Sequence, residues 1–364
     1  MANISNKKTS QQTTVVVGLS GGVDSSVAAA LLLEQGYNVV GVFMKNWEDT
    51  EQYTSECLAA EDYRDVVNVC GKLGIKHYTV NFVQKYRDEV FDYFLKTLQK
   101  GNTPNPDVLC NRQIKFGAFF DFAIQQLGAD FVATGHYAKA QDGNLYRAKD
   151  QSKDQTYFLN QVHTDKLRQT IFPLADYLKV DIRALANKYG LSTASKKDST
   201  GICFVGERNF KDFVHQFLQP NPGDIVDTQG NIVGKHTGLH GYTIGQRRGL
   251  GIGGVKDSQG SWFVVSKEIS TNRLVVKQSD QSVLNSTQCK VDNINLIGKS
   301  NWQKGNTYQC TAKFRYRQQD VAVTVNFDDI TTVVFETPQR AVTVGQYAVF
   351  YDGQRCLGGG EIIQ

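Results

Sequence analysis

Short apolar runs alternate with amphipathic stretches over the first 135 residues of the chain. The apolar runs are short enough for buried strands and lie at 13–19, 38–43, 75–82 and 130–135. Helical patterns lie between the later runs, at 55–73, 84–100 and 113–127. Strands that alternate with helices predict a parallel, doubly wound α/β sheet, in which ligands bind beyond the carboxyl ends of the strands.

The pattern is less regular between residues 136 and 208. Asp142-Gly143 is a hairpin signal. A helical stretch opens at residues 153–159, and residues 178–190 have the pattern of an amphipathic helix that ends at a glycine. The small, polar residues 195–206 predict a loop.

Helical periodicity is nearly absent from the last third of the chain. Residues 219–260 are dense in Gly, Pro, Asp and His, with a hairpin signal at 227–231 and a glycine-rich basic loop at 245–251. From residue 261 onward, short Val, Thr, Phe and Tyr runs alternate with turns, which predicts a small barrel or sandwich. We therefore expect a disordered tail (1–12), an α/β catalytic domain (13–208), a small β-rich linking domain (209–275) and a C-terminal β-barrel (276–364).

Between the first strand and the Ala/Leu-rich helix that follows it lies the turn Ser20-Gly-Gly-Val-Asp-Ser-Ser26. Glycines let the backbone approach a ligand closely, and a helix N-terminus adds N–H donors and partial positive charge. The turn lacks the Lys-Ser or Lys-Thr of a Walker A loop, which suits chemistry that releases pyrophosphate from ATP. It resembles the PP-loop of the ATP-pyrophosphatase superfamily; the alternative is an ordinary strand–helix turn capped by Ser20 or Asp24.

Composition narrows the class of protein only slightly. The chain of 364 residues contains no apolar run long enough to span a membrane and no signal-peptide pattern at its polar start. Its seven cysteines include no Cys-x-x-Cys pair, which argues against a zinc knuckle and a secreted disulfide framework, so we expect a cytoplasmic protein. The net charge of +4 permits nucleic-acid binding without demonstrating it.

Two cysteines lie in sequences typical of reactive loops. Cys110 follows Asn105-Pro-Asp-Val-Leu, and we expect it at a helix N-terminus, where a thiol pKa is lowered, with Asp107 close by as a proton carrier. Cys203 lies in the glycine-flanked sequence Gly201-Ile-Cys-Phe-Val-Gly206. We expect both thiols to be reactive rather than buried in the core, and the remaining five cysteines to be buried.

Lys313-Phe-Arg315-Tyr-Arg317 alternates cations with aromatic residues. On a strand, this alternation places three positive charges on one face, which suits phosphates or a solvated surface equally well. Arg247-Arg248 allows the same two interpretations. His136 follows a predicted strand, where it could pack in the core or contact a base, and no partner residues are spaced for a metal site.

These motifs together resemble one family over essentially all of the chain after the tail, the bacterial tRNA-specific 2-thiouridylases. The resemblance is carried by the turn at 18–25, by both cysteine motifs, and by Ala133-Thr-Gly-His-Tyr137, Lys153-Asp-Gln155 and Gly245-Gln-Arg-Arg248. It implies that ATP adenylates the C2 oxygen of the wobble uridine of a tRNA and that pyrophosphate leaves.

The resemblance also implies roles for residues. Cys203 carries a persulfide sulfur from a sulfur-donor protein, Cys110 is the nucleophile that closes a disulfide with Cys203, and Asp107 is the acid/base. Nucleotide contacts fall on Gly18, Leu19, Ser20, Gly21, Gly22, Val23, Asp24, Ser25, Met44 and Gly135. Contacts with the target base or tRNA fall on Asn105, Pro106, Asp107, His136, Lys153, Asp154, Gln155, Arg315, Tyr316 and Gln346. The implied cofactors are ATP and the Mg²⁺ that accompanies it.

Three alternatives remain open at this point. A PP-loop ligase that adenylates a small metabolite would need neither Cys110 nor Cys203. A non-catalytic tRNA-binding protein with a relic nucleotide site would bind RNA without releasing pyrophosphate. An iron–sulfur thiolase of the same superfamily is disfavoured because no cysteines lie close together in the sequence.

Overall fold

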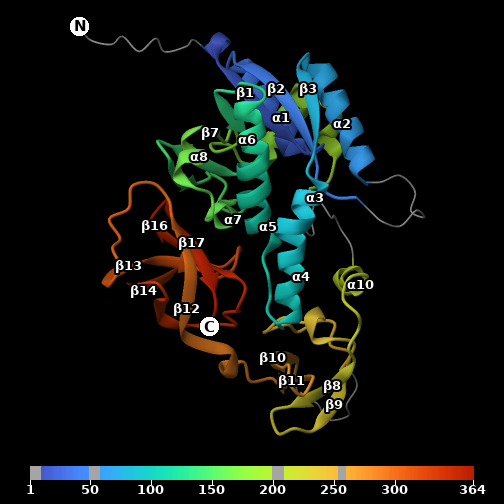
Figure 1. Cartoon of the computed structure of the whole chain (residues 1–364), viewed down its shortest axis with the longest axis vertical. Helices are drawn as coiled ribbons and strands as arrows, with labels where there is room; N and C mark the ends of the chain where they lie inside the picture. Colours follow the sequence, from blue (N-terminus) through green and yellow to red (C-terminus); the bar gives the residue numbers. More distant parts are fainter. Residues whose placement is uncertain (1–9, 49–57, 199–208, 253–259) are drawn as a thin grey trace.

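A parallel five-stranded sheet with strand order β3-β2-β1-β4-β7 forms the upper part of the molecule (Figure 1). The computed structural model describes residues 10–48, 58–198, 209–252 and 260–364. The strands are β1 (Thr14–Leu19), β2 (Asn38–Lys45), β3 (Lys76–Asn81), β4 (Phe131–Ala133) and β7 (Thr170–Ile171). The first four confirm the predicted strands, whereas the two-residue β7 is too short to give a sequence signal.

Helices cover both faces of this sheet, as a doubly wound fold requires. On one face, Val15 and Val17 of β1 pack with residues of α1 (Val23–Glu34) and α2 (Leu58–Leu73). On the other face, Val16 packs with Phe116 and Phe119 of a helix that continues as α6 (Phe120–Gln125). Alternate side chains of the same β-branched strand therefore point into two separate cores.

The first domain also holds several shorter elements. A continuous helix of α3 (Val83–Tyr86), a π-helical segment (Arg87–Phe91) and α4 (Asp92–Gln99) extends downward from the sheet (Figure 1). The others are 3-10 turns at Ser10–Gln12 and Ser192–Ser195, and helices α7 (Thr156–Leu159), α8 (Thr164–Arg168) and α9 (Lys179–Lys188). Residues 10–12, at the end of the expected tail, form a 3-10 turn, and the helix expected at 153–159 begins only at Thr156.

The central domain is a four-stranded sheet of order β10-β11-β8-β9, preceded by α10 (Phe210–His215). Its strands are β8 (Gly223–Asp227), β9 (Ile232–His236), β10 (Trp262–Glu268) and β11 (Arg273–Gln278), with a 3-10 turn at Leu239–Gly241. The hairpin signal at 227–231 is confirmed, because the Asp227 carboxylate accepts the backbone N–H groups of Gln229 and Asn231 at 2.9 Å each.

The last domain is a closed six-stranded barrel, since β12 pairs with both β15 and β17. A 3-10 turn (Ser282–Leu284) precedes the strands β12 (Asn285–Leu296), β13 (Asn306–Lys313), β14 (Val321–Phe327), β15 (Thr331–Arg340), β16 (Tyr347–Asp352) and β17 (Arg355–Ile362). The predicted hairpin of the first domain, β5 (Ala138–Gln141) and β6 (Asn144–Arg147), extends the barrel sheet by pairing with β17. The first and last domains therefore share one sheet.

Residues 313–317 do not form a continuous strand. β13 ends at Lys313, and the following residues turn away from the sheet with Phe314 buried. Arg315 instead points to backbone carbonyls, so the three cations do not share one face. The alternating cations and aromatic residues therefore lie mostly in a turn and not on a strand.

Candidate active site

The turn after β1 has a backbone shape that only glycine adopts without strain. Gly21 has a φ of 74°, and a Cβ atom there would lie 2.6 Å from the carbonyl oxygen of Asp62. The Ser25 hydroxyl holds the turn, because it accepts the Ser20 N–H and donates to the Gly22 carbonyl, each at 3.2 Å. No side chain caps α1 at Gly22, so an uncapped helix N-terminus faces outward at the carboxyl edge of the sheet.

This turn lies at the point where the strand order reverses. β1 has β2 on one side and β4 on the other, and a crevice at such a point is the usual ligand site of an open α/β sheet. Gly135, beyond β4, approaches so closely that a Cβ atom would lie 2.7 Å from the Ser25 nitrogen. The Met44 Cε lies 3.1 Å from the equivalent position on Gly18. The residues expected to bind nucleotide are therefore neighbours, and nucleotide binding itself stays a prediction.

The sequence reading missed a lysine at this turn. Lys179, the first residue of α9, places its Nζ atom 2.7 and 2.8 Å from the two carboxylate oxygens of Asp24 and 2.8 Å from Asp198. The Tyr137 hydroxyl also donates to Asp24 at 2.9 Å. A Walker A lysine follows its glycines directly, whereas this one lies 155 residues after Asp24. No fixed sequence spacing could have indicated it.

Asp198 joins the lysine to further cations. Its carboxylate accepts from Lys153 at 2.9 Å and from Arg183 at 3.0 Å. Burial acts to raise the pKa of Asp198, but the hydrogen bonds from Lys179 and Lys153 outweigh it and lower the pKa to about 2. Cys203 belongs to the segment 199–208, which lies outside the described residues, so its predicted role is not addressed by the geometry.

The helix that carries Asp107 and Cys110 begins earlier than expected. Asn105 is its N-cap and accepts the Val108 N–H through its side chain at 3.4 Å, and Pro106 occupies the first helical position. The helix runs through α5 (Pro106–Leu109) and a ten-residue π-helical segment, Cys110–Phe119, into α6. The two prolines had suggested a loop, but a proline at the first position begins a helix without cost.

Cys110 is consequently not at a helix N-terminus, and the expectation of an accessible thiol is wrong for it. It lies one turn into the helix with no exposed surface, in an apolar cluster with Trp47, Tyr86 and Phe213. Its backbone N–H bonds to the Asp107 carbonyl, which fixes the two residues one helical turn apart. The thiol is therefore shielded from solvent in this structure.

The predicted burial of the other cysteines is largely confirmed. Cys70, Cys289 and Cys356 are buried, and burial raises the pKa of each thiol, to about 11 for Cys70 and about 12 for the other two. Cys310 is half-buried with a pKa raised to about 12. Cys57 lies outside the described residues.

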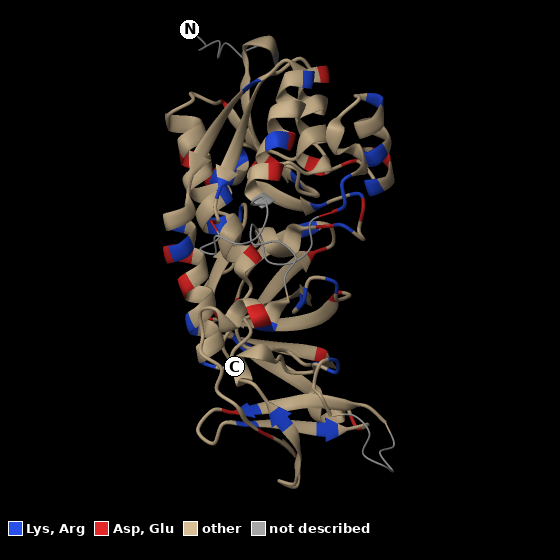
Figure 2. Ribbon diagram, turned by 90° about the vertical axis from the view of Figure 1, so that its right-hand side faces the viewer, with Lys and Arg blue, Asp and Glu red and all other residues tan. Residues whose placement is uncertain are grey.

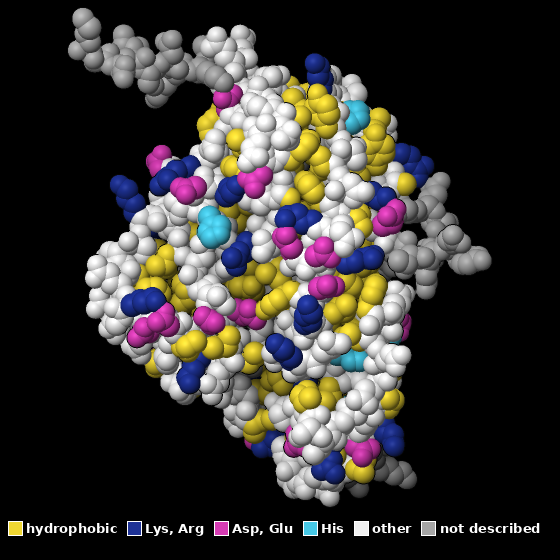
Figure 3. Space-filling model, in the orientation of Figure 1, with side chains coloured by type: hydrophobic (Ala, Val, Ile, Leu, Met, Phe, Trp, Pro, Cys, Tyr) yellow, Lys and Arg dark blue, Asp and Glu magenta, His cyan; other side chains and the backbone are white. Residues whose placement is uncertain are grey.

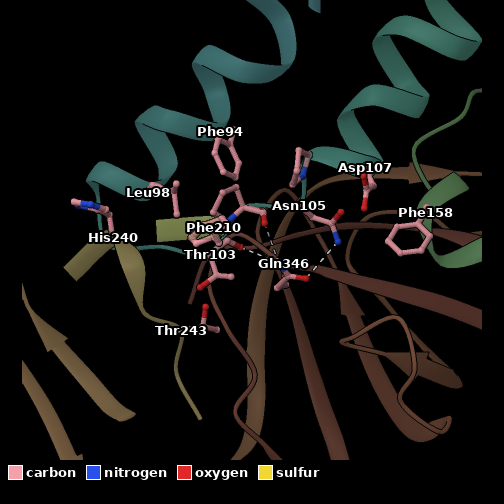
Figure 4. A pocket seen from close by; sticks show the side chains of 12 residues that line it. Phe94, Leu98, Thr103, Asn105, Asp107, Phe158, Phe210, His240, Thr243 and Gln346 are labelled. Atoms are coloured by element: carbon pink, nitrogen blue, oxygen red, sulfur yellow. Dashed lines mark hydrogen bonds between the residues drawn. The ribbon is translucent and has the colours of Figure 1, made fainter. Parts of the chain in front are cut away.

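A cavity of about 340 Å³ lies where the three domains meet (Figure 4). Asp107 and Phe158 line one end, Asn105 and Gln346 the middle, and His240 with other central-domain residues the opposite end. The remaining lining residues are Phe94, Leu98, Thr103, Pro104, Pro106, Phe210 and Thr243. An apolar wall with a few convergent polar groups is typical of a site for a planar organic ligand.

His136 is buried beside the helical segment Cys110–Phe119 and does not line the cavity. Its Nδ1 lies 2.7 Å from the Thr134 hydroxyl and its Nε2 lies 3.5 Å from the Lys115 Nζ, while Phe116 and Phe172 pack on the ring. Burial, together with the positive charge of Lys115, holds the pKa of His136 well below its ordinary value. The ring is therefore neutral near pH 7, and its contact with RNA stays a prediction.

The side chains of residues 153–155 make ion pairs or hydrogen bonds with other groups of the protein. The buried Asp154 carboxylate accepts the Ala148 N–H and the Thr156 hydroxyl, and the Gln155 side chain accepts the Tyr137 N–H. The Tyr316 hydroxyl donates to the Lys153 carbonyl at 3.4 Å, and the Tyr316 ring packs on Phe158 with centroids 4.4 Å apart. These residues thus support the Phe158 wall of the cavity, and their expected contacts with tRNA stay predictions.

Arg315 and Gln346 connect the barrel to the other domains. The Arg315 guanidinium donates to the carbonyls of Ile244 at 3.2 Å and Ala341 at 2.8 Å. The Gln346 amide donates to the Thr103 carbonyl at 2.9 Å and accepts from Asn105 at 3.3 Å. Gln346 thus lines the cavity from the barrel side, and Arg315 ties the barrel to the central domain.

Charge and metal-ligating groups add little to the outline of the site. Acidic and basic side chains are interspersed over the face of the molecule in Figure 3. Within the described residues, no three His, Cys, Asp or Glu side chains gather in a way that could hold a metal ion. None of the described helices combines the length and apolar character needed to cross a membrane.

Family models match all three domains. They are described as a tRNA methyl transferase HUP domain over residues 13–207, a tRNA methyl transferase PRC-barrel domain over 211–278, and an aminomethyltransferase beta-barrel domain over 286–362. The fold and its nucleotide turn thus define a protein of the PP-loop superfamily, a HUP domain followed by two β domains.

Curated relatives narrow the class further. The chain is 52% identical to the tRNA-specific 2-thiouridylase MnmA of Limosilactobacillus reuteri (strain DSM 20016), with 96% of this chain and 95% of the relative covered. It is 53% identical to MnmA of Listeria innocua (96% and 94% covered) and 52% identical to MnmA 2 of Geobacillus kaustophilus (98% and 96% covered). The chain belongs to the tRNA-specific 2-thiouridylase family.

Likeness to solved structures is weak by comparison. A 4-thiouridine synthetase–RNA complex with bound ATP aligns at a TM-score of 0.34 and 18% identity, over 56% of this chain and 50% of that chain.

Proposed function

We propose that this chain catalyses the ATP-dependent 2-thiolation of the wobble uridine of tRNA, through an adenylated uridine and a cysteine persulfide. One observation carries the proposal: a single helix joins the two halves of the site. Asn105 and Asp107 lie at the cavity on its first turn, and Phe119 lies 3.2 Å from the Cβ position of Gly18 in the nucleotide turn. The relatives' name supplies the substrate class and the position of the sulfur.

The first step activates the uridine. The C2 oxygen attacks the α-phosphorus of ATP, the bond between the α- and β-phosphates breaks, and pyrophosphate leaves. The uncapped N-terminus of α1, Ser20 and the ammonium of Lys179 would hold the phosphates. This step is needed because the carbonyl oxygen of a uracil ring is a poor leaving group, whereas AMP is a good one.

The second step replaces oxygen by sulfur. The terminal sulfur of a Cys203 persulfide attacks C2 and AMP leaves, which joins the base to Cys203 through two sulfur atoms. The Cys110 thiolate then attacks the Cys203 sulfur, so the base keeps its sulfur as a thiocarbonyl and the two cysteines form a disulfide. A thiol reductant restores both cysteines, and a sulfur-donor protein reloads Cys203.

We assign the proton transfers at the base to Asp107. It lies at the cavity wall beside Phe158, one turn from Cys110. As a carboxylate, it would accept the N3 proton when the C2 oxygen becomes nucleophilic, and return it later. The Asn105 amide, held by Gln346, would orient the base edge.

Magnesium would arrive with ATP, since this cation is usually bound by one or two carboxylates together with substrate phosphates. Asp24 is the carboxylate nearest the turn, and its charge is shared with Lys179 in this structure. The wobble base must leave its stack to enter the cavity, as bases acted on by enzymes do.

A single-turnover assay tests the proposal. The protein is mixed with Mg-ATP, a persulfide source and unmodified tRNA, and pyrophosphate and 2-thiouridine are measured together. We expect tRNA to trigger pyrophosphate release and thiolation, and Cys203→Ser and Cys110→Ser to release pyrophosphate without thiolation. Cys70→Ala, a matched change of a buried thiol outside the site, should retain both.

The opposite result is equally informative. If no tRNA-dependent pyrophosphate appears, the proposal fails at its first step and the substrate must be sought among small molecules. If Cys110→Ser thiolates at the wild-type rate, the proposed exchange step is wrong.

A further inference from the structure

Three basic side chains gather behind the end of the cavity farthest from Asp107. His240 lines that end (Figure 4). The ring of His215, on α10, meets the His240 ring edge-on with centroids 5.3 Å apart. Lys267, on β10, is near enough that its charge, after burial and the charge of His215, helps lower the pKa of His240. One helix, one strand and one 3-10 turn thus bring these basic groups together.

One nitrogen on each of these side chains is buried without a hydrogen-bond partner in the described part of the chain. The His215 Nε2, the His240 Nε2 and the Lys267 Nζ are all buried and unbonded. The aliphatic stem of Lys267 packs beside the C-terminal end of α4, with its Cδ 3.7 Å from the Cβ position of Gly101. Its ammonium nevertheless donates to none of the carbonyls there. Burial lowers the pKa of Lys267 to about 8.

The acidic side chains nearby are engaged elsewhere. Burial lowers the pKa of His236, and the negative charge of Asp224 acts against this effect. The Asp224 carboxylate also lies 3.8 Å from the Lys235 ammonium on the outer strand β9. In Figure 2, the strands of the central sheet carry more Lys and Arg than Asp and Glu. A buried ammonium without a counter-charge is costly, and native structures rarely keep one without a reason. Three unbonded nitrogens, one on the cavity-lining His240 and two on the residues behind it, are an arrangement that an anion would satisfy.

We propose that the His240 end of the cavity binds a backbone phosphate of the RNA strand, adjacent to the nucleotide whose base occupies the Asn105–Asp107 end. This inference rests on the proposed function, and it adds a subsite that reads the strand beside the target base. The cavity of about 340 Å³ extends from Asp107 to His240, past Phe94 and Phe210. Lys267 and His240 would share the phosphate oxygens through charge-assisted hydrogen bonds.

The test compares two lysines of the same domain. Lys267→Met removes the buried charge while keeping the stem, and Lys235→Met removes an exposed charge, 83% accessible, from the same sheet. We expect Lys267→Met to weaken binding of unmodified tRNA about tenfold, the effect of one lost charge-assisted hydrogen bond. We also expect the slope of log affinity against log salt concentration to be about 1 unit shallower for Lys267→Met than for the wild type. Lys235→Met should bind like the wild type.

Three further measurements keep the test decisive. The unfolding temperature of Lys267→Met should be no lower than that of the wild type, because the substitution removes an unpaired buried charge. Inorganic phosphate should shift the NMR signals of the His215 and His240 rings in the wild type and in Lys235→Met, but not in Lys267→Met. Lys267→Arg should keep most of the tRNA affinity.

The outcomes separate this inference from the proposed function. If the wild type thiolates tRNA while Lys267→Met and Lys235→Met bind it equally well, the phosphate subsite is overturned and the proposed function stands. If the wild type binds no tRNA, the proposed function fails. The phosphate titration then decides the anion site alone, and the absence of a ring shift overturns it.

Discussion

Asp24 is held by groups that come from distant parts of the chain. Its carboxylate bonds to the Lys179 ammonium and the Tyr137 hydroxyl, and Lys179 also bonds to Asp198. The lysine side chain is only 13% exposed, so its bonds lie in a partly desolvated setting where a charge matters more than at the surface. The nucleotide turn therefore has a cation, although its own sequence contains none.

Replacing this lysine should weaken nucleotide binding. In Lys179→Met, the phosphates lose a cation and Asp24 loses its partner, so we expect ATP affinity to fall about tenfold. Isothermal titration with ATP and Mg²⁺ measures the change. Lys188→Met is the matched control, since that lysine is on the same helix but 63% exposed. Equal ATP affinities for the two variants would show that Lys179 does not contribute to nucleotide binding.

Single residues also show where sequence reasoning was sufficient. The glycine turn was recognisable because its geometry is local: Gly21 needs its positive φ whatever the rest of the chain does. Cys110 was misjudged because its burial depends on Trp47, Tyr86 and Phe213, which lie far away in the sequence. Lys179 was not identified because its contact with Asp24 also joins residues that lie far apart in the sequence.

At the level of elements, the strands of the first domain were predictable and the start of one helix was not. β1 to β4 lie in short apolar runs, a local signal. Asn105-Pro106 was interpreted as loop, although an N-cap followed by proline at the first position is also a helix start. The pairing of β6 with β17 depends on contacts across the whole chain, and no local pattern contains it.

The contact between the end of β4 and the start of α1 offers a test at this scale. In Gly135→Ala, the new Cβ would lie 2.7 Å from the Ser25 nitrogen, so the turn must shift. We expect a loss of stability of about 1–3 kcal/mol, as for other overpacked sites, together with weakened ATP binding. Thermal unfolding and ATP titration measure the two effects.

Gly71→Ala is the matched control for this change. Nothing lies within 4 Å of its Cβ position, and alanine favours the helix in which it lies. We expect it to be neutral or stabilising by up to about 1 kcal/mol. Unchanged ATP affinity in Gly135→Ala would contradict the close approach described above.

At the level of the whole molecule, the cavity exists only because three domains are held together. The barrel is fixed to the first domain by the shared sheet, by Gln346 and by the bond from the Tyr93 hydroxyl to Glu361. The central domain is tied to the barrel through Arg315, which is half-buried between them. Each domain is recognisable in the sequence, but their arrangement depends on these few polar contacts.

Removing the Arg315 contacts should loosen the central domain. In Arg315→Met, the carbonyls of Ile244 and Ala341 lose their donor, so we expect about 1–3 kcal/mol of destabilisation. Hydrogen exchange should also become faster around residues 243–246 and 341–346. Arg317→Met, a change of an exposed neighbour, should have neither effect. Unchanged exchange in Arg315→Met would show that other contacts hold the domains.

The fate of the uridine oxygen tests the central claim most directly. A tRNA labelled with ¹⁸O at C2 of the wobble uridine is thiolated in a single turnover, and the AMP is analysed by mass spectrometry. Adenylation at that oxygen followed by displacement must carry the label into the AMP phosphate, so we predict one ¹⁸O in each AMP formed. AMP without the label, alongside normal 2-thiouridine, would contradict the adenylated intermediate and with it the mechanism proposed for this site.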